Sequence, residues 1–102
     1  MTSLDEIGQE FLQFMLSFYE EYPKYKQREL VMTGESFAGK YLSYSSRAIL
    51  DYNDSLSDSD SGTKFDLNTM ILSNPLVDTP TERLEQHRVG WALGFYDDFQ
   101  TE

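Results

Sequence analysis

A chain of 102 residues accommodates at most one small domain, and a domain of this size buries only somewhat over ~60% of its unfolded surface. The contents of 39% hydrophobic and 15% aromatic residues are too high for a disordered chain and indicate a packed interior. The 8 basic and 18 acidic residues give a formal net charge of -10, which repels nucleic-acid phosphates and anionic membrane surfaces. We therefore expect no nucleic-acid partner.

Metal and membrane functions are disfavoured as well. The chain has no cysteine and one histidine, so we expect neither a disulfide framework nor a thiolate or zinc site. It has no apolar run of about eighteen residues, and no basic-then-apolar leader precedes the first helical pattern. We expect no membrane span and no signal peptide in this segment, and the sequence indicates no metal and no cofactor.

The first expected element is a helix over residues 4–21. Ser3 and Glu6 resemble a capping box at its start, and Pro23 ends the pattern. Apolar side chains recur between them at helical spacing: Ile7, Phe11, Met15, Phe18 and Tyr22. We interpret this aromatic stripe as a surface that faces the core rather than as a binding groove.

Two strands and two further helices are expected after it. Leu30 to Thr33 is a short apolar run without alternation, which predicts a strand covered on both faces. A turn and a helix over residues 37–50 follow, and Leu67 to Leu72 predicts a second strand. The intervening helix makes the two strands parallel neighbours. Thr81 is expected to cap a third helix over residues 82–93.

Residues 51–64 are polar, acidic and rich in serine, which predicts an exposed loop. A calcium-binding EF-hand loop is disfavoured, because no register supplies both the required glycine and the final glutamate. Asn53 begins the triplet Asn-Asp-Ser, an N-glycosylation sequon, and is a candidate glycosylation site.

These elements give the order helix, strand, turn, helix, strand, helix, with a two-stranded parallel βαβ unit. The expected fold class is α/β. Two parallel strands flanked by helices cannot hide both faces and both edges, because parallel sheets normally lie within larger sets of strands. We therefore interpret residues 1–102 as part of an α/β domain rather than as a whole one.

The stretch GESFAGK, residues 34–40, has the glycine and lysine spacing of a Walker phosphate loop. Tyr41, however, replaces the Ser or Thr that would hold magnesium, and Glu35 would place a carboxylate inside the anion cradle. The second strand ends at Asn74 instead of at a Walker B aspartate. These three departures disfavour a phosphate site.

A nucleophile elbow explains the same stretch better. It needs small residues two before and two after a nucleophile at a tight turn from strand to helix, and Gly34 and Ala38 flank Ser36 in this way, with Gly39 next. The Phe37 N–H would point toward a developing oxyanion, and the helix N-terminus would favour its charge. Local spacing alone does not separate this nucleophile from a serine that caps the helix.

Two stretches, FLQFMLSFYEEYPKYKQRELVMTGESFAGKYL and DLNTMILSNPLVDTPTE, together resemble the serine carboxypeptidase family of α/β hydrolases. GESFAG matches the family's Gly-Glu-Ser-Tyr-Ala-Gly with Phe37 in place of Tyr, and Tyr41 falls where the family has an aromatic residue. Ser73 and Asn74 stand where Gly-Asn is usual. The resemblance covers nearly all of this chain but only a middle portion of the family's domain, which implies an α/β-hydrolase-like partial domain over residues 1–102.

The resemblance implies a hydrolase that removes C-terminal residues of peptides and proteins through an acyl-enzyme. It implies that Ser36 is the nucleophile and that the Phe37 amide is one oxyanion donor. Glu35 would belong to a carboxyl-rich hydrogen-bond network that recognises the terminal carboxylate of the substrate. A solvated turn carboxylate is the alternative for Glu35. The resemblance further implies a vacuolar, lysosomal or secreted location.

The groups that would activate Ser36 are expected outside this segment. In this fold the second oxyanion donor comes from an earlier glycine-rich loop, and the chain has no Gly-Gly pair. Asp78 and His87 follow Ser36 in the triad's chain order, but in the family both partners lie much farther along, so we assign His87 a packing or surface role. We therefore expect a fragment or truncated relative that is inactive by itself.

Two alternatives stay open at this point. One is a non-catalytic interaction protein that pairs its exposed sheet edges with a partner chain, in place of the remainder of the hydrolase domain. The other is a carboxypeptidase-like acyltransferase, which the same elbow would serve.

Overall fold

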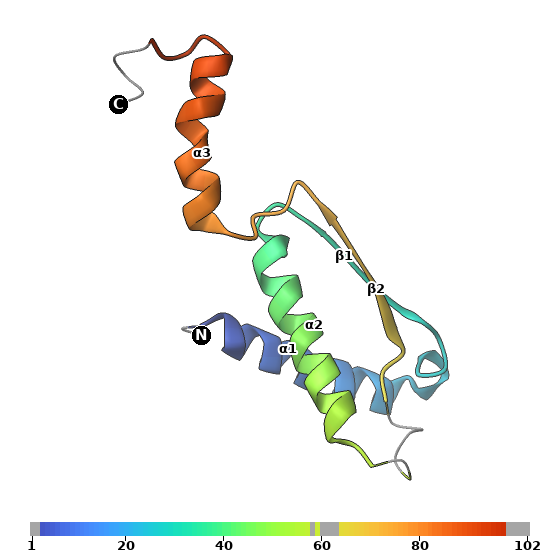
Figure 1. Cartoon of the computed structure of the whole chain (residues 1–102). Helices are drawn as coiled ribbons and strands as arrows, with labels where there is room; N and C mark the ends of the chain where they lie inside the picture. The colour runs from blue at the N-terminus through green and yellow to red at the C-terminus, as the bar shows by residue number, and fades with distance from the viewer. Residues whose placement is uncertain (1–2, 58, 60–63, 98–102) are drawn as a thin grey trace.

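The computed structural model describes residues 3–57, 59 and 64–97. Its elements are α1 (Leu4–Glu21), the short 3-10 helix η1 (Pro23–Tyr25), β1 (Leu30–Glu35), α2 (Ala38–Ser55), β2 (Leu67–Ser73) and α3 (Thr79–Ala92). In Figure 1 the two strands run side by side, α1 and α2 lie together, and α3 projects away from the other elements. The expected order of elements and the α/β class are confirmed.

Helix α1 begins and ends where the sequence predicts. The Ser3 hydroxyl accepts a hydrogen bond from the Glu6 N–H at 3.2 Å, which caps the helix. Tyr22 is the C-cap residue, and Pro23 opens η1 directly after it. The helix therefore has a side-chain cap at its start and a proline just past its end.

The sheet has two parallel strands. Their register runs from Leu30 opposite Leu67 to Glu35 opposite Ser73, with an irregularity between Leu30 and Val31. Because α2 connects the end of β1 to the start of β2, the two strands point the same way. The predicted βαβ unit is present, and β1 is two residues longer than expected.

The core joins α1, α2, β1 and the segment before β2. Its buried residues are Leu12, Met15, Tyr19, Met32, Ala38, Leu42, Ala48, Ile49 and Phe65. On the opposite face of the sheet, Val31 is 44% exposed and Ile71 is 55% exposed. The expectation that the first strand is covered on both faces is wrong for the described part of the chain, because both long packed helices contribute to the core on one face only.

Helix α2 extends five residues beyond the expected end, so part of the predicted loop is helical. The Asn53 carboxamide in its last turn donates to the Phe65 carbonyl at 2.8 Å and accepts from the Phe65 N–H at 2.8 Å. Arg47 pairs with Asp51 at 2.9 Å one turn earlier. These contacts stabilise a helical turn that the acidic composition disfavours. Residues 58 and 60–63 of the predicted loop lie outside the described residues.

Helix α3 begins earlier than predicted. Its N-cap residue is Asp78, not Thr81, which lies in the first turn and donates its hydroxyl hydrogen to the Asp78 carboxylate. The Glu82 carboxylate accepts from the Val77 N–H at 2.8 Å and from the Asp78 N–H at 3.2 Å. Glu82 therefore satisfies the N–H groups of the cap residue and of the residue before it. Within the described residues, α3 contacts no other helix or strand.

Candidate active site

Ser36 lies between the last residue of β1 and the first turn of α2, and its side chain is exposed. Its φ angle is 58°, in the left-handed region that residues other than glycine rarely adopt. Such a conformation costs about 1–3 kcal/mol and persists only where the surroundings hold it. This is the strained turn from strand to helix that the elbow hypothesis requires.

The alternative role of Ser36 as a helix cap does not hold. The N-cap residue of α2 is Phe37, and no side-chain hydrogen bond caps that helix. The Ser36 hydroxyl makes no hydrogen bond within the described residues, while the Ser36 N–H donates to the Ser73 carbonyl and the Ser36 carbonyl accepts from the Gly39 and Leu76 N–H groups.

The small residues around Ser36 are required by close packing. A Cβ atom on Gly34 would lie 2.5 Å from the Ala38 Cβ and 2.7 Å from a methyl carbon of Leu42. Ala38 itself is 0% exposed. The start of α2 can therefore approach the end of β1 only because both positions carry almost no side chain.

The backbone at the start of α2 is arranged to receive negative charge. Gly39 N–H bonds to the Ser36 carbonyl at 3.1 Å and Lys40 N–H to the Phe37 carbonyl at 2.9 Å, whereas the Phe37 N–H has no acceptor among the described residues. That donor belongs to the residue after Ser36 and lies at the positive end of the α2 dipole. An anion at this point would gain a hydrogen bond and a favourable field.

Two neighbouring side chains flank the turn on the surface. Glu35 is the last residue of β1, opposite Ser73 in the register, and is exposed. The Phe37 ring is 51% exposed and lies 6.2 Å, centroid to centroid, from the ring of Tyr41. A carboxylate and an aromatic pair thus border the serine at the carboxyl end of the sheet.

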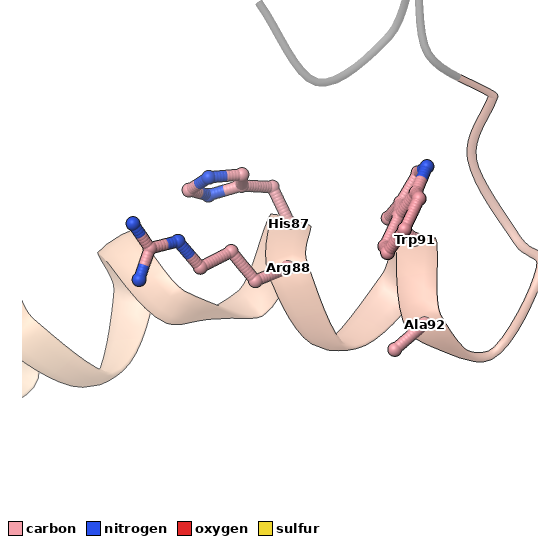
Figure 2. Close-up of a pocket in the computed structure, with 4 residues that line it drawn as sticks. All are labelled: His87, Arg88, Trp91 and Ala92. Carbon is pink, nitrogen blue, oxygen red and sulfur yellow. The ribbon is translucent and has the colours of Figure 1, made fainter.

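Asp78 and His87 do not join this turn. Both are exposed; His87 belongs to α3, which contacts neither β1 nor α2 in the described chain, and the Asp78 carboxylate accepts a hydrogen bond from the Thr81 hydroxyl. His87, Arg88, Trp91 and Ala92 border a hollow of ≈ 570 Å³ on α3 (Figure 2), and Asp78 caps the other end of that helix. Within the described residues, no hydrogen bond joins the side chain of Asp78 or of His87 to Ser36.

Asn53 lies in the last turn of α2 and not in a loop. The nitrogen that would carry a glycan is the one that donates to the Phe65 carbonyl at 2.8 Å. Glycosylation of Asn53 stays a prediction, and it would replace one of the two hydrogens on this nitrogen.

Residues 3–57, 59 and 64–97 contain neither a metal-binding cluster nor a membrane-spanning helix. No group of three His, Cys, Asp or Glu side chains there could hold a metal ion. No helix in that part of the chain combines the length and the apolar character that crossing a bilayer requires.

Sequence reasoning placed Asn74 at the end of the second strand but missed its backbone conformation beside the elbow. It follows β2 with a φ of 43°, also in the left-handed region. The signal in the sequence was the dipeptide Asn74-Pro75 directly after a strand, since asparagine tolerates this conformation and Asn-Pro marks turns.

A parallel βαβ unit with a strained serine between strand and helix defines a unit of the α/β-hydrolase type. The family model described as serine carboxypeptidase matches residues 1–102, and the chain belongs to that family.

Individual relatives agree with this assignment. The chain is 35% identical over 89 residues to Serine carboxypeptidase-like 42 of Arabidopsis thaliana, covering 87% of this chain and 18% of that protein. It is 32% identical over 84 residues to the Pheromone-processing carboxypeptidase KEX1 of Candida glabrata, covering 82% of this chain and 11% of that protein. The chain thus spans less than a fifth of either relative.

The fold is also found in a solved structure. The prohormone-processing carboxypeptidase Kex1 from Saccharomyces cerevisiae superimposes with a TM-score of 0.84 at 26% identity. The match covers 94% of this chain and 20% of that one. The partial α/β domain inferred from the sequence therefore has a close structural counterpart in the family.

Proposed function

We propose that this chain carries the nucleophile of a serine-type carboxypeptidase, which hydrolyses C-terminal residues of peptides and proteins. The observation that carries the proposal is the left-handed backbone of Ser36, at φ 58°, in a chain that belongs to the serine carboxypeptidase family. A strained, exposed serine at the carboxyl end of a parallel strand is the arrangement that acyl transfer on this fold uses.

In the proposed reaction the Ser36 oxygen attacks the carbonyl carbon of the last peptide bond and loses its proton to a base. The Phe37 N–H donates to the oxyanion that forms, and the start of α2 stabilises its charge. Collapse of this intermediate expels the C-terminal amino acid and leaves an ester on Ser36, which water then hydrolyses.

Glu35 is proposed to help recognise the substrate. Its position next to Ser36, on the surface at the sheet end, suits a group that meets the terminal carboxylate of a peptide. Two carboxyl groups can bond there only when one holds a proton, so this contact favours an acidic working pH.

We further propose that residues 1–102 alone are catalytically incompetent. His87 lies on α3, which contacts neither of the elements that hold Ser36, and the Asp78 carboxylate is bonded to the Thr81 hydroxyl. A serine hydroxyl without an aligned base is a poor nucleophile. The base, its carboxylate partner and the second oxyanion donor would come from the remainder of the hydrolase domain or from a partner chain, in a vacuolar, lysosomal or secreted setting.

A fluorophosphonate probe tests the nucleophile. We expect it to label the protein in its natural length and not its Ser36→Ala form, while Ser17→Ala, a change at an exposed serine of α1, keeps full labelling. Equal labelling of the wild type and Ser36→Ala would reject Ser36. Release of the C-terminal residue from a model peptide, followed by mass spectrometry, separates hydrolysis from transfer of the acyl group to an added alcohol.

A non-catalytic interaction protein is the second candidate. It is favoured by the uncovered sheet face, on which Val31 and Ile71 are about half exposed. Parallel sheets are normally covered on both faces, so a partner chain could lie there. Absence of probe labelling in the wild type, together with capture of a partner that Ile71→Lys abolishes, would support this function instead.

A further inference from the structure

Two strained residues meet at the carboxyl end of the sheet. Among the described residues, Ser36 at φ 58° and Asn74 at φ 43° are the non-glycine residues with positive φ. Each directly follows a member of the last pair in the strand register, Glu35 and Ser73. The two left-handed residues therefore leave neighbouring strands at the same level.

Backbone hydrogen bonds connect the two turns. The Ser36 N–H donates to the Ser73 carbonyl at 3.1 Å, and the Leu76 N–H donates to the Ser36 carbonyl at 2.8 Å. These two bonds enclose Asn74 and Pro75. The two polar backbone groups of Ser36 are thus held by the last residue of β2 and by the segment that follows it.

The first turn of α2 packs closely against the same segment after β2. A Cβ atom on Gly39 would lie 2.6 Å from the Leu76 carbonyl oxygen and 2.8 Å from the Pro75 Cβ. Gly39 therefore lets residues 75 and 76 lie against the first turn of α2. This contact gives Gly39 a role that the elbow spacing alone does not require.

We propose that Asn74 is a positioning residue for Ser36. Its left-handed backbone turns the chain after β2, so that the Leu76 N–H reaches the Ser36 carbonyl and holds Ser36 at its own positive φ. Asparagine and glycine adopt this conformation readily, whereas a β-branched residue does not. The catalytic part of this inference rests on the proposed role of Ser36 as nucleophile.

The test compares Asn74→Val with Asn74→Gly in the protein in its natural length. Two properties are measured: hydrogen exchange at the Ser36 and Leu76 amides, and the rate of labelling by a fluorophosphonate. We expect Asn74→Val to exchange faster at both amides and to label about tenfold more slowly, which is the size of the left-handed penalty. Asn74→Gly should stay close to the wild type in both.

The outcomes separate the two proposals. Wild-type exchange at both amides in Asn74→Val would overturn the positioning role, and so would an Asn74→Gly variant as impaired as Asn74→Val. If the wild type is not labelled at all, the nucleophile proposal fails, while amide exchange still decides whether Asn74 holds the Ser36 backbone. If Asn74→Val does not fold, Asn74→Ala, which lacks the β-branch, replaces it in the same comparison.

Discussion

At the scale of single residues, the small side chains around Ser36 determine how closely the backbone segments of the elbow can pack. Gly34, Ala38 and Gly39 each leave room for a neighbour that a larger side chain would displace. Ser36 then occupies a backbone conformation that its own side chain disfavours. The strain is confined to the backbone of Ser36, and the backbone hydrogen bonds of that residue offset its energetic cost.

Replacing Gly34 by alanine should destabilise the protein by about 1–3 kcal/mol, as overpacking of a tight site usually does. The added Cβ would lie 2.5 Å from the Ala38 Cβ, so the end of β1 and the start of α2 must separate. Denaturant unfolding measures the effect. Adding Ala38→Gly to Gly34→Ala should restore part of the stability, and a double variant no better than the single one would contradict this account.

Replacing Asn53 by aspartate should cost about 1–3 kcal/mol of stability, because the Phe65 carbonyl loses its donor and meets a carboxylate oxygen. The matched control is Asn68→Asp on β2, where the side chain is exposed and the oxygen that accepts from Thr69 is kept. Thermal unfolding of the two variants should differ clearly. Equal losses would show that added negative charge, and not the lost hydrogen bond, is responsible.

At the scale of elements, the structure depends on how closely α1 approaches α2. Gly8 is buried at this contact, and a Cβ atom there would lie 2.7 Å from the Tyr44 carbonyl oxygen. On the sheet side of α2, the Ser46 hydroxyl lies 3.4 Å from the Met32 sulfur. Helix α2 is thus packed on both sides, and it is the element that links α1 to the sheet.

Replacing Gly8 by alanine should destabilise the protein, although alanine is the better helix former by about 1 kcal/mol. The clash is with a backbone atom of α2, which cannot move aside as a flexible side chain would. We expect a lower denaturant midpoint for Gly8→Ala and none of this loss for Gln9→Ala, an exposed neighbour on the same helix. A raised denaturant midpoint for Gly8→Ala would mean that the higher helix propensity of alanine outweighs the clash with the Tyr44 carbonyl of α2.

The contact of α1 with the segment before β2 should make stability depend on pH at the alkaline end. Burial, and secondarily the charge of Asp66, raises the pKa of the Tyr19 hydroxyl. The unfolded state then releases the Tyr19 proton at about pH 10, before the folded state does. Stability from this group is therefore fully present below that pH and is lost as pH rises through the folded-state pKa.

Unfolding measured from pH 8 upward checks this dependence. Tyr19→Phe should flatten the alkaline loss, because phenylalanine has no proton to release. Tyr22→Phe, at a side chain that is 47% exposed on the C-cap of the same helix, should leave the slope unchanged. If the stability of Tyr19→Phe falls with pH as steeply as that of the wild type, groups other than Tyr19 cause the alkaline loss of stability.

At the scale of the whole molecule, the chain is extended. Its radius of gyration is 19.0 Å, whereas a compact domain of about 100 residues has about 13 Å. The excess comes from α3, which contacts no other described element, as Figure 1 shows. Large apolar side chains on and after α3 are exposed: Leu84, Val89, Trp91, Leu93, Phe95 and Tyr96. Such a surface is typical of an element that packs against further protein.

Trp91, the one tryptophan of these 102 residues, reports on this surface, being 53% exposed. In residues 1–102 expressed alone and helical by circular dichroism, we expect its fluorescence to be quenched efficiently by acrylamide. When further protein covers α3, quenching should fall. A protected Trp91 in the isolated chain, independent of concentration, would show that α3 folds back onto the other elements.

The sequence by itself determined the order of the elements and the position of the proposed nucleophile. Capping at Ser3, Pro23 after the first helix, and the small residues around Ser36 are local signals, because each acts through neighbours a few positions away. Matching motifs over the whole chain then identified the family, which the comparison with the family model confirms. These features needed no knowledge of distant contacts.

The tertiary structure decided what depends on residues far apart in the chain. Asn53 turns the start of an acidic loop into helix by bonding Phe65, twelve positions later. Leu76 reaches back to Ser36, so the strain at the elbow is shared with Asn74. Composition and spacing describe only what a residue prefers, whereas these outcomes follow from partners that the fold alone brings within hydrogen-bonding distance.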